Sequence, residues 1–167
     1  MSRFYFIEST LKNSHFKNGF IFMDENKDNS GQYSIENSTF VNNTSEYGTI
    51  FSIYTIRVAT GSSIDIRDCK FINNTSYNFG GVIYSVGEYN NKFVRFYDCI
   101  FSNNHARLGD IIYSYSKAAM PTFYSDTSYL NNDTLATIPT YFNIDGNPID
   151  KISILSGESI PEGISCK

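Results

Sequence analysis

Helix-forming residues are scarce in this 167-residue chain. It has only five leucines and five alanines, whereas it has 20 isoleucines, 14 phenylalanines and 13 tyrosines. It has no tryptophan. Leucine and alanine favour helices, whereas β-branched and aromatic residues favour strands. The 18 asparagines suit turns and stacked side-chain ladders. The composition therefore predicts an all-β protein, and the length is sufficient for one domain with a continuous core.

Long apolar runs and an excess of basic residues are also missing. No run approaches the roughly 18 apolar residues that a membrane-spanning helix requires, so we expect no membrane insertion. The 13 lysines and arginines are outnumbered by 17 aspartates and glutamates, which gives a net charge of −4. Because nucleic acids and anionic membranes attract basic surfaces, we expect neither as a partner.

A secretory leader is not visible at the start of the sequence. Met1, Ser2 and Arg3 lead straight into a strand-like run, so we expect a piece cut from a larger protein. We predict secretion instead from sequons for N-glycosylation, although a chain rich in asparagine and serine also produces sequons by chance. The sequons begin at Asn37, Asn42, Asn43, Asn73, Asn74 and Asn132.

One seven-residue block recurs along the chain. Its clearest copies, Asp68–Asn74 and Asp98–Asn104, both read Asp-Cys-x-Phe-x-Asn-Asn, and further copies begin at Asn37, Asp126 and, in degraded form, Glu8. The steps between the central residues of the copies are 29, 31, 30 and 28. These central residues are Leu11, Phe40, Phe71, Phe101 and Tyr129.

Two further short strands accompany each block. A second block, such as Gly81–Ser85, reads Gly-x-Ile-Tyr-Ser, and a third strand, such as Ile64–Ile66, precedes the first block. Variable loops between fixed strands are typical of a solenoid whose coils stack in parallel, because no coil can bury its inner face alone. We predict a right-handed, single-stranded parallel β-helix of about five coils of 28–31 residues, with three strands in each coil.

Alternation along the first block places its aromatic residue inward, beside a column of small residues. In that column the Cα atoms of Cys69 and Cys99 would lie ~4.8 Å apart, within the range of a disulfide. The two residues are therefore either a candidate bridge or two buried thiols that act as small apolar side chains. Cys166 lies outside the repeat, and we expect it to be free or paired with sequence beyond this chain.

The Asn-Asn pairs end the first block. One asparagine of each pair should point inward and form hydrogen bonds with its equivalents in neighbouring coils, because the turn backbone would otherwise be buried and unpaired. Only one sequon of each pair could then carry a glycan. The candidate glycosylation sites are Asn37, Asn43, Asn74 and Asn132.

The remaining polar groups predict no catalytic residue, metal site or cofactor. The column Glu8, Asn37, Asp68, Asp98 and Asp126 could bind calcium or cleave polysaccharide, but Asx-type turns at a corner explain it better. The segment Asp24–Gly31 resembles a calcium loop, yet it lacks the turn glycine and the bidentate glutamate, so a polar loop is favoured. His15 and His105 have no second ligand at metal spacing.

The second block carries the candidate binding surface. Its isoleucine column, with small serine neighbours, is typical of the inside, which leaves an aromatic strip outside. The column consists of Ile21, Ile50, Ile83 and Ile112, followed by Met23, Ser52, Ser85 and Ser114. Exposed apolar strips mark interaction sites, and tyrosine is a preferred anchor, although a loop or the rest of the protein could also cover the strip. The candidate partner-binding residues are Phe51, Ile53, Val82, Tyr84, Val86, Tyr113 and Tyr115.

The motif [Asp/Asn]-[Cys/Ser/Thr]-x-[Phe/Tyr]-x-Asn-Asn, followed by Gly-x-Ile-[Phe/Tyr]-Ser, resembles the repeats of polymorphic outer-membrane autotransporters. Over residues 4–135 it looks more closely like β-helix repeats in giant secreted proteins of anaerobic gut fungi, including cellulosome scaffoldins. That resemblance implies a cohesin that binds the dockerin domains of enzymes. It transfers no site residue, because no cohesin motif is matched.

We therefore expect a non-catalytic, cohesin-like module of a secreted scaffold, monomeric within a larger chain, with a dockerin-like protein as its partner. The alternatives are a structural or adhesin β-helix of a cell-surface protein and, less favoured, a polysaccharide-cleaving β-helix. Residues 1–143 would form the β-helix, and residues 144–167 would form closing strands or lead into a following module.

Overall fold

The computed structural model describes residues 2–24, 31–56, 62–124, 127–131 and 133–138, together with the backbone of three later strands. The chain divides into two compact units, Met1–Thr137 and Ile138–Lys167. In the second unit, β18 (Phe142–Ile144) pairs antiparallel with both β19 (Asn147–Ile149) and β20 (Ile164–Cys166). The role of this segment stays a prediction.

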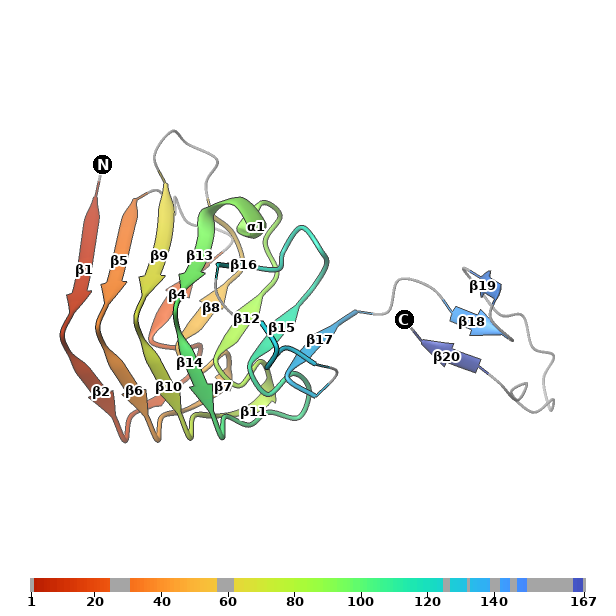
Figure 1. Cartoon of the computed structure of the whole chain (residues 1–167), viewed down its shortest axis with the longest axis horizontal. Helices are drawn as coiled ribbons and strands as arrows, with labels where there is room; N and C mark the ends of the chain where they lie inside the picture. The colour runs from red at the N-terminus through yellow and green to blue at the C-terminus, as the bar shows by residue number, and fades with distance from the viewer. Residues whose placement is uncertain are drawn as a thin grey trace. The chain divides into compact units, whose positions relative to one another are not determined.

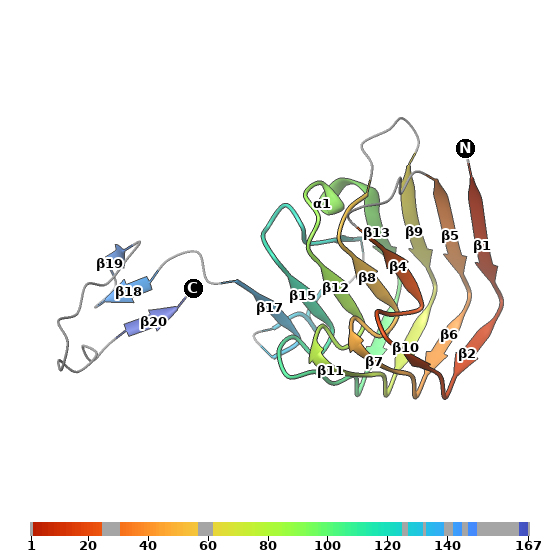
Figure 2. The same cartoon turned by 180° about the vertical axis from the view of Figure 1, so that it is seen from behind.

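The first unit is an all-β parallel solenoid of about four turns, as the sequence predicts in outline (Figures 1 and 2). Its strands form four parallel sheets, which we name A to D in chain order within a turn. Sheet A contains β1 (Arg3–Ile7), β5 (Gln32–Glu36), β9 (Ser63–Arg67), β13 (Val94–Tyr97) and β16 (Thr122–Phe123). Sheet B contains β2 (Thr10–Lys12), β6 (Thr39–Val41), β10 (Lys70–Ile72) and β14 (Ile100–Ser102).

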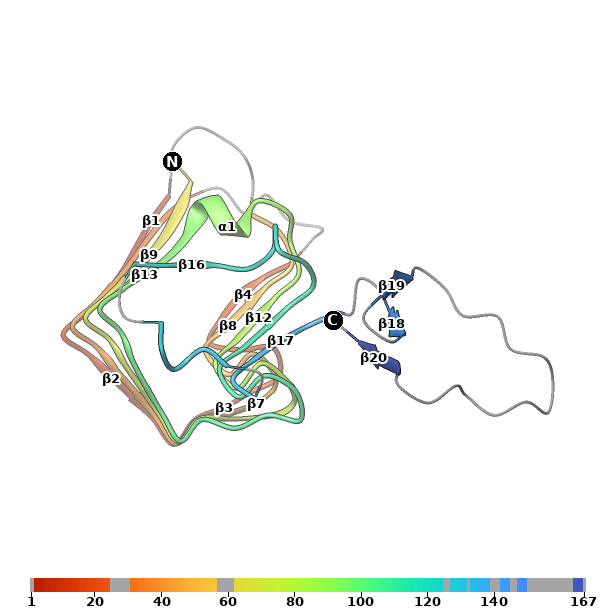
Figure 3. The ribbon, with the colours of Figure 1, turned by 45° about the vertical axis from the view of Figure 1, so that its right-hand side comes forward.

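The other two sheets complete each turn. Sheet C contains β3 (His15–Phe16), β7 (Thr44–Tyr47) and β11 (Thr75–Phe79). Sheet D contains β4 (Ile21–Met23), β8 (Phe51–Ile53), β12 (Ile83–Ser85), β15 (Ile112–Ser114) and β17 (Leu135–Thr137). A single-turn helix, α1 (Asn90–Phe93), lies between β12 and β13. Figure 3 shows the four sides of the solenoid.

Sheet C corrects the prediction of three strands per coil. Its strands follow the Asn-Asn pairs, in the segment that the sequence assigns to a turn. β3 has two residues, and the buried side chains of β7 and β11 are the serines Ser45 and Ser76. Apolar alternation therefore does not mark these segments as strands.

Left-handed residues form the corners of the solenoid. Glu8, Asn37, Asp68 and Asp98, with φ between 47° and 52°, form the corner between sheets A and B. The next side chain closes the corner by donating a hydrogen bond to the carbonyl two residues earlier, as Ser38 does to Glu36 at 2.7 Å. These four residues of the predicted acidic column are thus exposed in turns, whereas Asp126 lies outside the described residues. No group of acidic, histidine or cysteine side chains in the described residues could hold a metal.

The aromatic column inside sheet B is confirmed. The ring centroids of Phe40 and Phe71 lie 5.1 Å apart, those of Phe71 and Phe101 5.0 Å, and those of Phe101 and Tyr129 5.2 Å. Phe40 and Phe71 are fully buried. Ring spacing close to the ~4.8 Å between neighbouring strands means that the core repeats turn by turn.

The predicted asparagine ladder is also present, and it uses the second residue of each pair. Asn43 and Asn74 are fully buried, and Asn104 is nearly so. The Nδ2 atoms of Asn43 and Asn74 each donate to the Oδ1 atom of the next ladder residue at 3.0 Å. This ladder satisfies backbone groups at the corner between sheets B and C.

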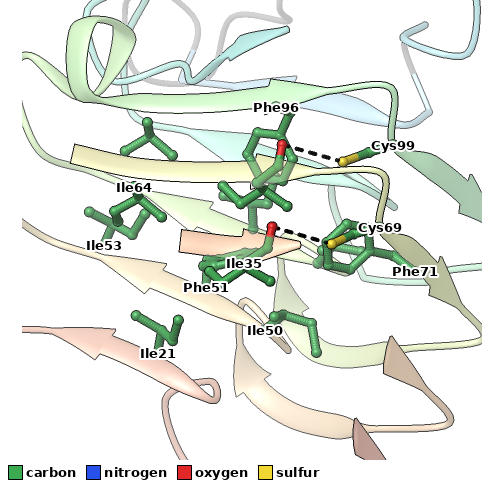
Figure 4. Packing of buried hydrophobic residues seen from close by; sticks show 14 of the residues in the cluster. Ile21, Ile35, Ile50, Phe51, Ile53, Ile64, Cys69, Phe71, Phe96 and Cys99 are labelled. Carbon is green, nitrogen blue, oxygen red and sulfur yellow. Dashed lines mark hydrogen bonds between the residues drawn. The ribbon is translucent and has the colours of Figure 1, made fainter. Parts of the chain in front are cut away.

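The candidate disulfide is not formed in this structure. Cys69 and Cys99 are free buried thiols (Figure 4). Each sulfur occupies the corner position of Ser38, and Cys69 Sγ donates to the carbonyl of Arg67 at 3.1 Å. The contact with Cys99 lowers the pKa of Cys69, while the same contact and burial raise the pKa of Cys99.

Candidate partner-binding surface

The residues predicted to bind a partner lie in the strands of sheet D or directly beside them. Ile21, Phe51, Ile83 and Ile112 form one inward column, because β4 and β12 both pair with β8 through Phe51. The outward column therefore contains Phe22, Ser52, Tyr84 and Tyr113. The motif Gly-x-Ile predicts that Ile50 aligns with Ile83. The strand of the second coil is shifted by one residue from that register, so Phe51 aligns with Ile83 instead.

Backbone hydrogen bonds show where the shift arises. In the later coils, two consecutive amides donate to one carbonyl of the next coil, as those of Val82 and Ile83 do to Ile111. The amides of Ile50 and Phe51 both donate to Val82, each at 3.0 Å. Phe51 is thus equivalent to Ile83, and Ile50 to Val82.

This register corrects three of the predicted partner-binding residues. Phe51, Ile53 and Val82 are each 0% exposed, so they belong to the core and cannot contact a partner on the outer surface. Phe51 packs edge-on against Phe96 and Phe71, with ring centroids 5.8 Å and 6.2 Å away. Figure 4 shows Phe51 among the buried residues.

The outer face of sheet D still carries aromatic rings. We name as the aromatic strip Phe22, Tyr47, Tyr54, Phe79, Tyr84 and Tyr113. Tyr84 stacks on Tyr113 with centroids 5.6 Å apart, and Phe79 stacks on Tyr113 at 4.8 Å. Phe79, Tyr84 and Tyr113 thus form a stack in which the rings cover one another's faces.

Tyr54 closes the gap that Ser52 leaves in the strip. Its ring lies edge-on to Phe22 at 5.8 Å and to Tyr84 at 5.6 Å. Ser52 is fully buried, and its Oγ atom has no hydrogen-bond partner among the described residues. At the first coil, a pocket of about 240 Å³ adjoins Phe22 and is lined also by Phe4, Phe20, Ile21 and Tyr33.

The phenols of Tyr84 and Tyr113 are held in their neutral form. Burial, followed by the neighbouring phenols of Tyr54, Tyr113 and Tyr47, raises the pKa of Tyr84 to about 12. Burial also raises the pKa of Tyr113. Tyr84 and Tyr113 therefore contribute uncharged hydroxyl groups to this aromatic surface.

Four predicted residues lie on or beside this surface. Tyr84 and Val86 are half-buried, Tyr113 is 9% exposed, and Tyr115 is 54% exposed. Sequence reasoning missed Tyr47, Tyr54 and Phe79, which lie at the ends of β7 and β11 or after β8, outside the repeated block. Phe22 shares the outward column and is 45% exposed.

The other predicted sites fall in different places. Asn37 is exposed at its corner, whereas Asn43 and Asn74 are buried in the ladder, which corrects their prediction as glycan acceptors. Asn132 and residues 25–30 of the candidate calcium loop lie outside the described residues. His105 Nδ1 lies 3.1 Å from Asp110 Oδ1, and His15 Nδ1 lies 2.9 Å from Thr44 Oγ1.

Comparison with known proteins finds a similarity in one part of the repeat region. Residues 68–86 match the model of the Chlamydia polymorphic membrane protein repeat. The segment contains the corner at Asp68, the ladder residue Asn74 and the glycine corner at Gly80, so it spans both repeated blocks. No curated protein and no solved structure matches the chain. Among the described residues, no helix is long and apolar enough to span a membrane.

Proposed function

We propose that the chain is a non-catalytic structural or adhesin β-solenoid of a cell-surface protein. The observation that carries the proposal is the match of residues 68–86 to a repeat of outer-membrane proteins. The solenoid would be right-handed, because crossovers between parallel strands of one sheet are almost always right-handed. It would hold the aromatic strip as a rigid contact surface outside the cell.

The strip supports the adhesin role because large aromatic residues usually dominate protein interfaces. Phe22 in the strip and Tyr115 beside it are about half exposed. They provide apolar area that is not used within the solenoid. A cohesin-like role, with dockerin domains as partners, rests on the repeat motifs alone and stays a prediction. A pull-down with purified fungal dockerin domains tests it separately.

The test uses beads coated with the full chain and added to intact epithelial cells. We expect the wild-type beads to adhere and the double variant Phe22→Ser, Tyr115→Ser to lose at least about tenfold in bound beads. The matched control is Tyr5→Ser, Tyr124→Ser, which removes two equally exposed aromatic side chains from the sheet A side. Absence of adhesion by wild-type beads, or equal loss in both variants, would contradict the adhesin role and leave the structural one.

A further inference from the structure

Two Asn-Asn pairs in neighbouring coils each contain overlapping sequons. In Asn42-Asn43-Thr44-Ser45 both asparagines satisfy the sequon rule, and the same holds for Asn73-Asn74-Thr75-Ser76. The sequon rule does not distinguish the two members of a pair, and our prediction from the sequence chose the second member, Asn43 or Asn74. The structure distinguishes them, because it places them in opposite environments.

The second asparagine of each pair has no free N–H. Asn74 Nδ2 donates to the carbonyl of Phe40 and to Asn104 Oδ1, both at 3.0 Å. Asn43 Nδ2 donates to the carbonyl of Leu11 and to Asn74 Oδ1, also at 3.0 Å. A glycosylated amide keeps only one N–H, and a sugar has no room at a site that is 0% exposed.

The first asparagine of each pair faces solvent. Asn42 and Asn73 adopt left-handed φ values of 54° and 53° at the corner between sheets B and C, and both are exposed. In contrast to Asn43 and Asn74, their side-chain amides make no hydrogen bond to the described part of the chain. Asn37, with φ 48°, is exposed in the same way at the preceding corner.

We propose that Asn42 and Asn73, together with Asn37, accept N-linked oligosaccharides, and that Asn43 and Asn74 do not. The donor is an oligosaccharide carried on a lipid pyrophosphate. The amide Nδ2 forms a bond to the anomeric carbon of the sugar, the bond from that carbon to the pyrophosphate oxygen breaks, and the amide releases one proton. The inference rests on the proposed function, because the chain must be exported to meet the transferase.

Folding enforces this selection even if transfer precedes folding. A chain modified at Asn43 or Asn74 could not form the buried ladder, so it would be absent from the folded population. Asn42 and Asn73 precede β7 and β11, whereas the strip residues Tyr47 and Phe79 lie at the far ends of these strands. Glycans at Asn42 and Asn73 would therefore leave the aromatic strip open to a partner.

Two matched variants test the assignment in the full chain, fused to a leader and expressed in a eukaryotic secretory host. Asn42→Gln keeps the sequon at Asn43, and Asn43→Gln keeps the sequon at Asn42, since Asn-Gln-Thr still satisfies the rule. Occupied sites in the folded, secreted protein are mapped by enzymatic deglycosylation in ¹⁸O water and mass spectrometry. We expect Asn42→Gln to lose the glycan of its pair, whereas Asn43→Gln retains it with a lower melting temperature.

A glycan on Asn43 or Asn74 in folded protein would overturn the inference. Folded, secreted protein without a glycan on Asn42 and Asn73 would overturn it as well. Bead adhesion is measured on unglycosylated protein from bacteria, so it does not depend on this result. Failure of the glycan assignment and failure of the adhesin proposal are therefore distinguishable.

Discussion

Tyr84 couples the aromatic strip to the stability of the solenoid. Its pKa rises from the ordinary value of 10.0 to about 12 because the phenol is desolvated and surrounded by other phenols. Between these pH values the folded chain retains the proton, while the unfolded chain releases it. This contribution to stability is therefore complete below pH 10 and is lost as the pH rises toward 12.

We predict that Tyr84→Phe flattens the alkaline loss of stability. Phenylalanine keeps the stacked ring but has no proton to release, so the free energy of unfolding should fall less steeply between pH 10 and 12. Urea unfolding at several pH values measures the effect. Tyr5→Phe, which alters a tyrosine that is 59% exposed, is the matched control. Identical pH profiles for wild type and Tyr84→Phe would contradict the assignment.

The strands of sheet D show how far the sequence determines the fold. The repeat predicts parallel stacking, the inward column Leu11–Phe40–Phe71–Phe101 and the asparagine ladder, because these depend on a motif of fixed length. The register of β8 was predicted wrongly because the spacing varies between the glycine and the strand. Aligning Gly48 with Gly80 and Gly109, all with positive φ, instead of with Gly81, gives the observed register.

The candidate site was predictable only in part for a related reason. Tyr54, Tyr47 and Phe79 join the strip through side-chain packing across turns, and no repeated motif marks them. Ser52 was assigned to the inner column, although it lies in the outward column and Tyr54 covers it. Local alternation determines which way a strand residue points, but it does not show which neighbouring ring fills the space beside a small residue.

The glycine corner before sheet D should tolerate no side chain. A Cβ atom at Gly80 would lie 2.0 Å from the carbonyl oxygen of Ile83, and the backbone has φ +67°. We predict that Gly80→Ala destabilises the protein by about 2 kcal/mol or more, from backbone strain and the clash together. Gly80→Asn separates the two causes, because asparagine tolerates this φ but retains the Cβ atom. Urea unfolding should show similar losses for both variants, and full recovery in Gly80→Asn would contradict a clash.

The solenoid as a whole is a stack of coils with unequal burial. Phe71, in a middle coil, lies between Phe40 and Phe101 and is fully buried. Leu11 occupies the same column in the first coil, where it is only partly buried. In such a stack each coil is stabilised mainly by its nearest neighbours, and among the described residues the first coil pairs with the second coil alone.

The position of a coil in the stack should therefore decide how far the destabilisation caused by a cavity extends to other coils. We predict that Phe71→Ala lowers the free energy of unfolding by ~3–5 kcal/mol and Leu11→Ala lowers it by ~2 kcal/mol or less. The effect of Leu11→Ala is smaller because the partly buried Leu11 removes less apolar area from water. Hydrogen exchange distinguishes local from global effects. Leu11→Ala should accelerate exchange in β1 and β2 and leave β10 protected, whereas Phe71→Ala should accelerate exchange in β6, β10 and β14 together. Uniform acceleration of all strands by Leu11→Ala would mean that the coils unfold as one unit and that the first coil is no weaker than the rest.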